Sequence, residues 1–153
     1  MVVDTSVLFS IERMPQDADI YAPPGVFSEL ERHGDTRHLL LQELITVIDP
    51  GRTSLSLVRK AATETGDDAR LSTVDLEVVA LAHELRATIL TDDYSIQNLA
   101  SHMGLDFQGV GQSGISKVLR WKYKCLGCGR VWKERFEECP VCGSPLRSHR
   151  SRK

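Results

Sequence analysis

The sequence predicts an α/β fold, with a central mostly parallel sheet flanked by helices, followed by a small cysteine-containing module. Residues 1–110 alternate short apolar strand-like runs with longer helix-like runs, an order typical of α/β layers. All four cysteines of the 153-residue chain lie within Cys125–Cys142. The charge changes at a similar place. Residues 1–116 carry 8 Lys+Arg and 18 Asp+Glu, a net −10, whereas residues 117–153 carry 11 and 3, a net +8.

The first half of the α/β part shows two complete strand-to-helix alternations. Short strands are predicted at 1–3, before the prolines of 19–34, and at 46–51, where Pro-Gly ends the run. Helices are predicted over 4–14, from the prolines to Gly34, and over 35–45. The sheet strands expected here are therefore short and apolar.

The second half contains the clearest helix. Residues 54–66 read as a helix, and 71–87 place Val74, Val78, Leu81 and Leu85 at helical spacing. Within this segment, Ser72 and Asp75 match a capping box. A strand at 88–91, a helix at 93–104 and a last strand at 106–110 complete the alternation.

These patterns predict four segments. Residues 1–110 form the α/β domain, 111–123 a flexible basic linker, 124–147 the cysteine module and 148–153 a disordered basic tail. No signal peptide and no run of about 18 apolar residues is visible, so we expect a cytoplasmic protein without a membrane partner. The sequence does not indicate an oligomeric state.

The cysteine module has the pattern C-x2-C, ten residues, C-x2-C. Two such turns present four thiolates at the corners of a tetrahedron, so one structural zinc ion is expected on Cys125, Cys128, Cys139 and Cys142. Gly127, Gly129 and Gly143 permit the tight turns. Disulfides and an iron centre are the alternatives. A module this small needs the metal to fold, and four sulfur ligands leave no open position for catalysis.

The basic C-terminal part also holds four of the nine aromatic residues. Aromatic rings among lysines and arginines suit single-stranded nucleic acid, because bases stack and phosphates pair. Trp132 and Phe136 have an equal claim to a purely structural role in the core of the module. The predicted RNA-binding residues are Trp121, Lys122, Lys124, Arg130 and Lys133.

Several carboxylates of the α/β part follow strands or begin helices. Asp4 follows the first strand, and Asp92 and Asp93 follow the strand at 88–91. The carboxyl ends of parallel strands share one crevice, so these acids can converge with Asp75. Carboxylates without basic partners are typically compensated by Mg²⁺ or Mn²⁺, which can activate water for attack on a phosphodiester.

Each acid also has an ordinary structural interpretation. Asp4 could cap the following helix, Asp75 could only complete its capping box, and Asp92 or Asp93 could be a helix N-cap. Local pattern does not separate Glu29 from Glu31. Together with the basic, aromatic C-terminal part, however, the acids favour a metal-dependent nuclease.

The segments "VVDTSVL", "PPGVFSELE", "LSTVDLEVVALAHEL" and "ILTDDYSIQNLA" resemble the successive motifs of PIN-domain ribonucleases, over about residues 1–110. With the ribbon pattern "CxGC…CPxCG", nearly the whole chain resembles the Nob-type (Nin-one-binding) endonucleases of archaea and eukaryotes. The compact length is similar to that of archaeal members.

The resemblance implies a PIN-like domain plus zinc ribbon that cuts single-stranded precursor small-subunit rRNA at its mature 3′ end, within a pre-ribosomal particle. It implies one or two catalytic Mn²⁺ or Mg²⁺ ions. The site would comprise Asp4, Glu29, Asp75 and Asp93, with Asp4, Asp75 and Asp93 as direct ligands. Thr5, or less readily Ser6, would orient a carboxylate, and Asp92 would support the same loop.

Three other functions remain open. A toxin-type PIN ribonuclease is disfavoured by the ribbon, which such chains usually lack. A catalytically weak rRNA-binding assembly factor is disfavoured by the intact acidic set. A zinc-ribbon protein that binds protein partners is disfavoured by the basic, aromatic connector.

Overall fold

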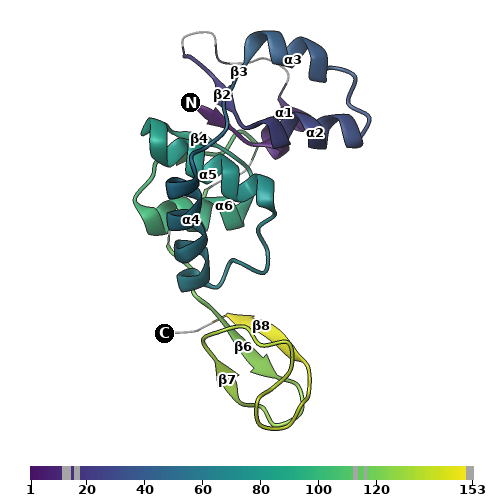
Figure 1. Cartoon of the computed structure of the whole chain (residues 1–153), viewed down its shortest axis with the longest axis vertical. Coiled ribbons are helices and arrows are strands. Elements are labelled where there is room, and N and C mark those ends of the chain that lie inside the picture. The colour runs from purple at the N-terminus through teal and green to yellow at the C-terminus, as the bar shows by residue number, and fades with distance from the viewer. Residues whose placement is uncertain (12–14, 16–17, 112–113, 116, 151–153) are drawn as a thin grey trace.

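The computed structural model describes residues 1–11, 15, 18–111, 114–115 and 117–150 (Figure 1). It contains a helix-flanked parallel sheet and a second, antiparallel sheet near the C-terminus (Figure 1). We call residues 1–110 the body and residues 121–150 the ribbon. In the described residues, no helix is long and apolar enough to cross a membrane.

The body sheet has five short strands in the order β3-β2-β1-β4-β5, and every neighbouring pair is parallel. The strands are β1 (Val2–Val3), β2 (Tyr21–Ala22), β3 (Thr46–Val47), β4 (Ile89–Leu90) and β5 (Phe107–Gln108). The predicted α/β class with a mostly parallel sheet is therefore confirmed. Its central strands are fully buried and apolar, as expected for strands covered by helices on both faces.

Six helices connect and cover these strands. They are α1 (Thr5–Ser10), α2 (Pro24–Arg32), α3 (His38–Leu44), α4 (Arg52–Thr65), α5 (Thr73–Leu85) and α6 (Tyr94–Met103). Each lies within or close to its predicted segment, although residues 12–14 of the first one lie outside the described part. Helix α5 is buried nearly all round from Val78 to Ala82, while Leu85 is exposed where the helix ends.

The strand order places a switch point between β1 and β4. From β1 the chain proceeds outward through β2 to β3, whereas β4 and β5 lie on the other side. At such a point the connections diverge, and ligands bind outside the carboxyl ends of the strands. Asp4 follows β1 directly, and Thr91 follows β4, so the two predicted acidic loops are neighbours.

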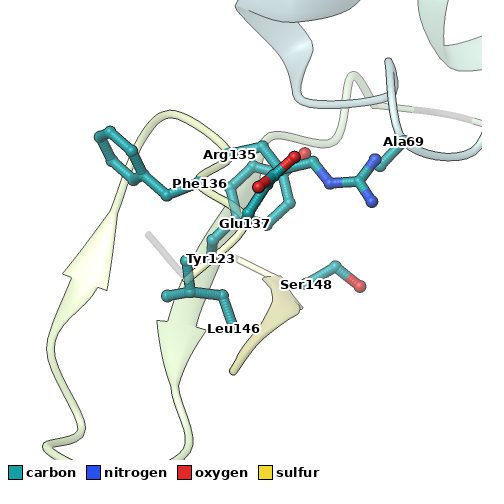
Figure 2. Close-up of a pocket in the computed structure, with 7 residues that line it drawn as sticks. All are labelled: Ala69, Tyr123, Arg135, Phe136, Glu137, Leu146 and Ser148. Atoms are coloured by element: carbon teal, nitrogen blue, oxygen red, sulfur yellow. The ribbon is translucent and has the colours of Figure 1, made fainter. Parts of the chain in front are cut away.

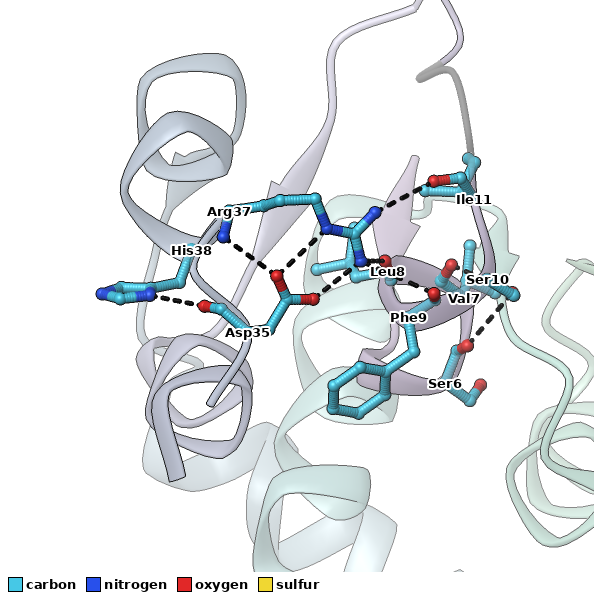
Figure 3. A network of polar contacts seen from close by, with 9 residues as sticks. All are labelled: Ser6, Val7, Leu8, Phe9, Ser10, Ile11, Asp35, Arg37 and His38. Atoms are coloured by element: carbon cyan, nitrogen blue, oxygen red, sulfur yellow. Dashed lines mark hydrogen bonds and ion pairs between the residues drawn. The ribbon is translucent and has the colours of Figure 1, made fainter. Parts of the chain in front are cut away.

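A clamp around Arg37 fixes the end of α1 (Figure 3). The Arg37 guanidinium donates to the carbonyl oxygens of Leu8 at 2.9 Å and Ile11 at 3.4 Å, and it pairs with Asp35 at 2.7 Å. Carbonyls at a helix C-terminus lack intrahelical donors, and a cation satisfies them. The clamp therefore holds the short helix whose N-terminus carries Asp4.

The ribbon is a three-stranded antiparallel sheet of order β7-β6-β8. Its strands are β6 (Trp121–Cys125), β7 (Val131–Trp132) and β8 (Leu146–Arg150). The expected disordered tail is wrong for residues 148–150, because β8 pairs with β6 along its whole length. Residues 121–123, expected in the linker, likewise belong to β6. Without β8, one edge of β6 would carry unpaired backbone N–H and C=O groups. The residues of β8 pair with these groups.

Candidate functional site

Asp4 lies at the centre of the predicted acidic site. It occupies the N-cap position of α1, but its carboxylate makes no capping hydrogen bond. Instead it is 3% exposed and accepts hydrogen bonds from Ser6 Oγ at 2.5 Å and Thr91 Oγ1 at 2.9 Å. Burial raises the pKa of Asp4, the two hydroxyls oppose that shift, and the charge of Asp93 adds to it. The helix-cap interpretation of Asp4 therefore does not explain its carboxylate.

The doublet after β4 divides into two different roles. Asp93 is the N-cap of α6 and accepts from Ser95 N at 2.6 Å. Asp92 accepts from the backbone N–H groups of Val110, at 2.9 Å, and Gly111, at 3.1 Å, and so ties down the chain after β5. Of the two acids, Asp93 is therefore the helix cap, while Asp92 supports the neighbouring loop.

Asp75 begins α5 within the predicted capping box. Its Oδ2 accepts from Ser72 N at 2.6 Å, and its own N–H donates to Ser72 Oγ at 3.1 Å. Burial raises the pKa of Asp75 to about 6, and the charges of Asp4 and Asp93 contribute to the same shift. The capping box is therefore present. The Asp75 carboxyl also interacts electrostatically with Asp4 and Asp93, which come from distant segments.

Glu29 joins the site through α1. Its Oε2 accepts from Thr5 Oγ1 at 2.6 Å, whereas Glu31 is exposed. The structure therefore separates the two glutamates that local pattern could not rank. Thr5 thus donates to the Glu29 carboxylate, and Ser6 donates to the carboxylate of Asp4.

Asp4, Asp75 and Asp93 come together as an uncompensated acidic group. In the part of the chain that the structure describes, none of them forms an ion pair. They do not form a closed ligand set: among the described residues, only the four cysteines form a group of three or more side chains close enough to hold a metal ion. Each carboxylate is instead held by hydroxyl or backbone donors. Oxygen donors with net negative charge are the chemistry that Mg²⁺ and Mn²⁺ prefer.

The central role of Thr91 in the site was not predicted from the sequence. This residue is fully buried, donates to Asp4 and accepts from Asp93 N at 3.0 Å. One hydroxyl therefore joins the loops after β1 and β4. The available signal was a polar residue ending a buried apolar strand immediately before two acids.

The four cysteine sulfurs of the ribbon lie within 4.8 Å of one another, and the thiols are not paired in disulfides. The Sγ atoms of Cys125 and Cys142 are 3.4 Å apart, and those of Cys128 and Cys139 are 3.7 Å apart. A Zn–S4 tetrahedron with bonds of about 2.3 Å has sulfur–sulfur edges of about 3.8 Å, so the cluster fits a zinc ion.

The turns that form the cluster need their glycines. A Cβ on Gly127 would clash with the side chain of Ser144 and lie 3.4 Å from Cys142 Sγ. Gly129 and Gly143 have φ of +73° and +66°, a region that favours glycine. The hydroxyl and backbone N–H of Ser144 lower the pKa of Cys142 to about 6, which favours the thiolate.

The predicted RNA-binding residues all lie on the ribbon. Arg130 and Lys133 are exposed, and Lys122 and Lys124 are half-buried on β6. Trp121 is also half-buried, with the Arg70 guanidinium 3.6 Å from its ring centroid, so part of its ring faces the body. Trp132 and Phe136 pack edge to face with centroids 5.5 Å apart, as expected for a small core.

Comparison with known proteins agrees with this architecture. A family model described as the PIN domain of ribonuclease matches residues 1–85, and one described as PINc domain ribonuclease matches residues 68–121. The chain is 40% identical to Endoribonuclease Nob1 of Pyrococcus abyssi, over 96% of this chain and 91% of the relative. It is 35% identical to Endoribonuclease Nob1 of Methanothermobacter thermautotrophicus, over 91% and 86%.

A differently named relative has a similar extent of likeness. Ribonuclease VapC1 of Thermoplasma acidophilum is 37% identical over 97% of this chain and 77% of the relative. All three names denote ribonucleases, and the Pyrococcus protein matches along nearly its full length. The chain therefore belongs to the PIN-domain ribonucleases, and within them to the Nob1 group of endoribonucleases.

Proposed function

We propose that this protein is a metal-dependent endoribonuclease that cuts single-stranded precursor small-subunit rRNA to form its mature 3′ end. The observation that carries the proposal is the convergence of Asp4, Asp75 and Asp93 near the switch point of the sheet. The charge of Asp93 adds to the burial that raises the pKa of Asp4, and the charges of Asp4 and Asp93 add to the burial that raises the pKa of Asp75. Family membership supports the endoribonuclease activity, and the basic ribbon supports an RNA substrate.

We propose Asp4, Asp75 and Asp93 as ligands for one or two Mn²⁺ or Mg²⁺ ions. Such ions, when bound, activate water and stabilise charge developing on the phosphodiester. Thr91 and Ser6 hold the Asp4 carboxylate, and Asp93 is fixed at the start of α6. Glu29, which accepts a hydrogen bond from Thr5, would hold a second ion or position the attacking water.

We propose that the ribbon anchors the RNA, with one structural zinc ion on its four cysteines. The body carries a net negative charge, which repels the RNA polyanion, so the affinity for RNA must come from another part of the chain. The exposed cations Arg130 and Lys133, together with Lys122 and Lys124, provide it by phosphate contacts. A pre-ribosomal particle is the proposed setting, because the substrate is a ribosomal RNA precursor.

A toxin-type ribonuclease is the second candidate function, since VapC1 of Thermoplasma acidophilum is 37% identical. The Nob1 relative of Pyrococcus abyssi favours the rRNA function, because the match covers 91% of that protein against 77% of VapC1. A catalytically weak assembly factor predicts binding of the same RNA without cleavage.

The test uses a short RNA that spans the mature 3′ end of small-subunit rRNA, incubated with Mn²⁺ or with the ion omitted. We expect one cut that requires Mn²⁺ and leaves a 3′-hydroxyl. Asp4→Asn and Asp93→Asn should each slow cleavage by about 10³-fold, as loss of a metal ligand removes several kcal/mol of transition-state stabilisation.

Asp106→Asn is the matched control. Asp106 is exposed and lies at the amino end of β5, whereas Asp4 and Asp93 follow the carboxyl ends of β1 and β4. It should cut like the parent. Cleavage by Asp4→Asn and Asp93→Asn at the parental rate would refute the proposed enzymatic function. Cutting of unrelated messenger-like RNA at an equal rate would favour the toxin-type function.

A further inference from the structure

We propose that a pocket at the junction of body and ribbon binds a single unpaired guanine nucleotide of the RNA strand. The pocket has a volume of about 450 Å³ and is lined by residues of both parts, among them Ala69, Tyr123, Arg135, Glu137 and Ser148 (Figure 2). This inference rests on the proposed function for its ligand, single-stranded RNA.

The junction is a fixed contact, because the α4–α5 loop (residues 66–71) grips the ribbon. Tyr123 is 4% exposed and donates its phenolic hydroxyl to Asp68 Oδ1 at 3.1 Å. Arg70 stacks on Trp121 and donates to Ser148 Oγ at 3.1 Å. A Cβ on Gly66 would lie 2.9 Å from the Trp121 carbonyl oxygen. These contacts therefore hold Ala69, the body residue that lines the pocket, against the ribbon.

The chain leading into the ribbon is held as well. Asn98, 1% exposed on α6, donates to the carbonyl of Leu119 at 2.9 Å and accepts from its N–H at 2.5 Å. The same amide donates to the buried Asp67 carboxylate at 2.5 Å. The Asn98 amide therefore bonds both backbone groups of Leu119. This holds the segment that leads into β6 in a fixed position on the body.

The pocket offers a charge pattern suited to one nucleotide. Figure 2 shows the Arg135 guanidinium extending toward Ala69, and both Glu137 and Tyr123 line the same pocket. Arg135 is exposed and forms no ion pair with any residue that the structure describes. Its cation is therefore available for a phosphate or for the face of a base. The volume falls within the ~300–1,000 Å³ typical of ligand pockets.

Glu137 determines which base fits. An ionised carboxylate only accepts hydrogen bonds, so it cannot bind phosphate and must meet N–H groups. Guanine presents two adjacent N–H donors, N1–H and the N2 amino group, on the edge that proteins read in unpaired bases. Uracil offers one N–H between two carbonyl oxygens, which the carboxylate repels. Adenine and cytosine each offer one amino group beside an acceptor ring nitrogen, so only guanine presents two donors to the carboxylate, and the pocket prefers guanine.

The test measures binding of the full chain to fluorescein-labelled nine-nucleotide RNAs, by anisotropy, without added Mn²⁺ or Mg²⁺. Each RNA has eight uridines and a central G, A, C or U. The parent should bind the central-G strand about tenfold more tightly than the all-U strand. Glu137→Ala should remove this preference, and Arg135→Ala should weaken binding of the central-G strand by about tenfold.

Arg147→Ala is the matched control. Arg147 lies on β8 between Leu146 and Ser148, which line the pocket, so its side chain points to the opposite face. It removes the same charge and should weaken binding about twofold or less, with the guanine preference kept. Zinc content of every variant should equal that of the parent, because Arg135 and Glu137 are exposed.

The proposal for the pocket would be overturned if the parent showed no preference for guanine. It would also be overturned if Arg135→Ala and Arg147→Ala lost RNA affinity equally. Free GMP should bind at least about 100-fold more weakly than the central-G RNA, because it lacks the neighbouring phosphates; equal affinity would overturn the assignment to an RNA strand. Cleavage with Mn²⁺ is scored separately, so a protein that binds as expected but never cuts contradicts the proposed function alone.

Discussion

The protein holds two groups of candidate metal-ligand side chains that are assembled in opposite ways. In the ribbon, four sulfurs from two local turns lie within 4.8 Å of one another. In the body, the acids come from four segments between Asp4 and Asp93, and each is tied to its own hydroxyl or backbone donors. The first group is compact and closed, and the second is open.

The difference reflects what each group is suited to do. A closed thiolate site lowers the free energy of a fold too small to stabilise itself. An open carboxylate site keeps room for water and phosphate, at the expense of repulsion among its members. Burial raises the pKa values of Asp4 and Asp75, and repulsion from the neighbouring acids adds to both shifts.

Loss of the thiolate site should unfold one part of the chain only. Cys139→Ser combined with Cys142→Ser should abolish zinc binding and weaken RNA binding by about 100-fold, because the basic ribbon no longer folds. Metal content, anisotropy and circular dichroism of the body helices would show this. Val141→Ser, an exposed change between the same cysteines, should keep the zinc. Full RNA affinity in the double variant would show that the ribbon is not the anchor.

Thr91→Val tests whether one hydroxyl organises the open site. The change preserves side-chain shape but removes the donor to Asp4 and the acceptor for Asp93 N. We expect cleavage to slow by about tenfold and the free energy of unfolding to fall by about 1–3 kcal/mol. Thr73→Val, at the exposed start of α5, is the control. Single-turnover cleavage and urea unfolding give the two values, and parental values for both would contradict the role of Thr91.

The pKa of Asp75 gives a smaller, pH-dependent effect. Its folded-state pKa is about 6, above the value of about 3.9 for an unfolded Asp. The folded protein therefore holds this proton more tightly, and stability present at low pH is lost as the pH rises from about 4 to about 6. Without added Mn²⁺ or Mg²⁺, the melting temperature should fall by about 3–6 °C over this range.

Asp75→Asn should flatten that dependence, whereas the exposed Asp106→Asn should retain it. Added Mn²⁺ at pH 7 should raise the melting temperature of the parent more than that of Asp75→Asn, because the ion binds the folded state. Thermal melts followed by circular dichroism measure all of these. An identical pH profile for the parent and Asp75→Asn would show that Asp75 does not share the charge of the site.

Much of this architecture was predictable from local pattern. The alternation of apolar runs gave the α/β class, and Ser72 with Asp75 gave a capping box that the structure contains. The cysteine spacing located a complete ligand cluster, since all its members lie in two short turns. Residues 148–150 were wrongly expected to be disordered, because their pairing with β6 depends on a partner strand that local composition does not indicate.

The sequence alone determined the strand and helix segments and the thiol cluster, whose physical causes act within a few residues. Only the tertiary structure decided the roles of Asp92 and Asp93, the choice of Glu29 over Glu31, and the link of Thr91 to Asp4. It also decided how the α4–α5 loop grips the ribbon. These contacts join segments up to 87 residues apart, and only the packing of the sheet and its helices brings their atoms within hydrogen-bonding distance.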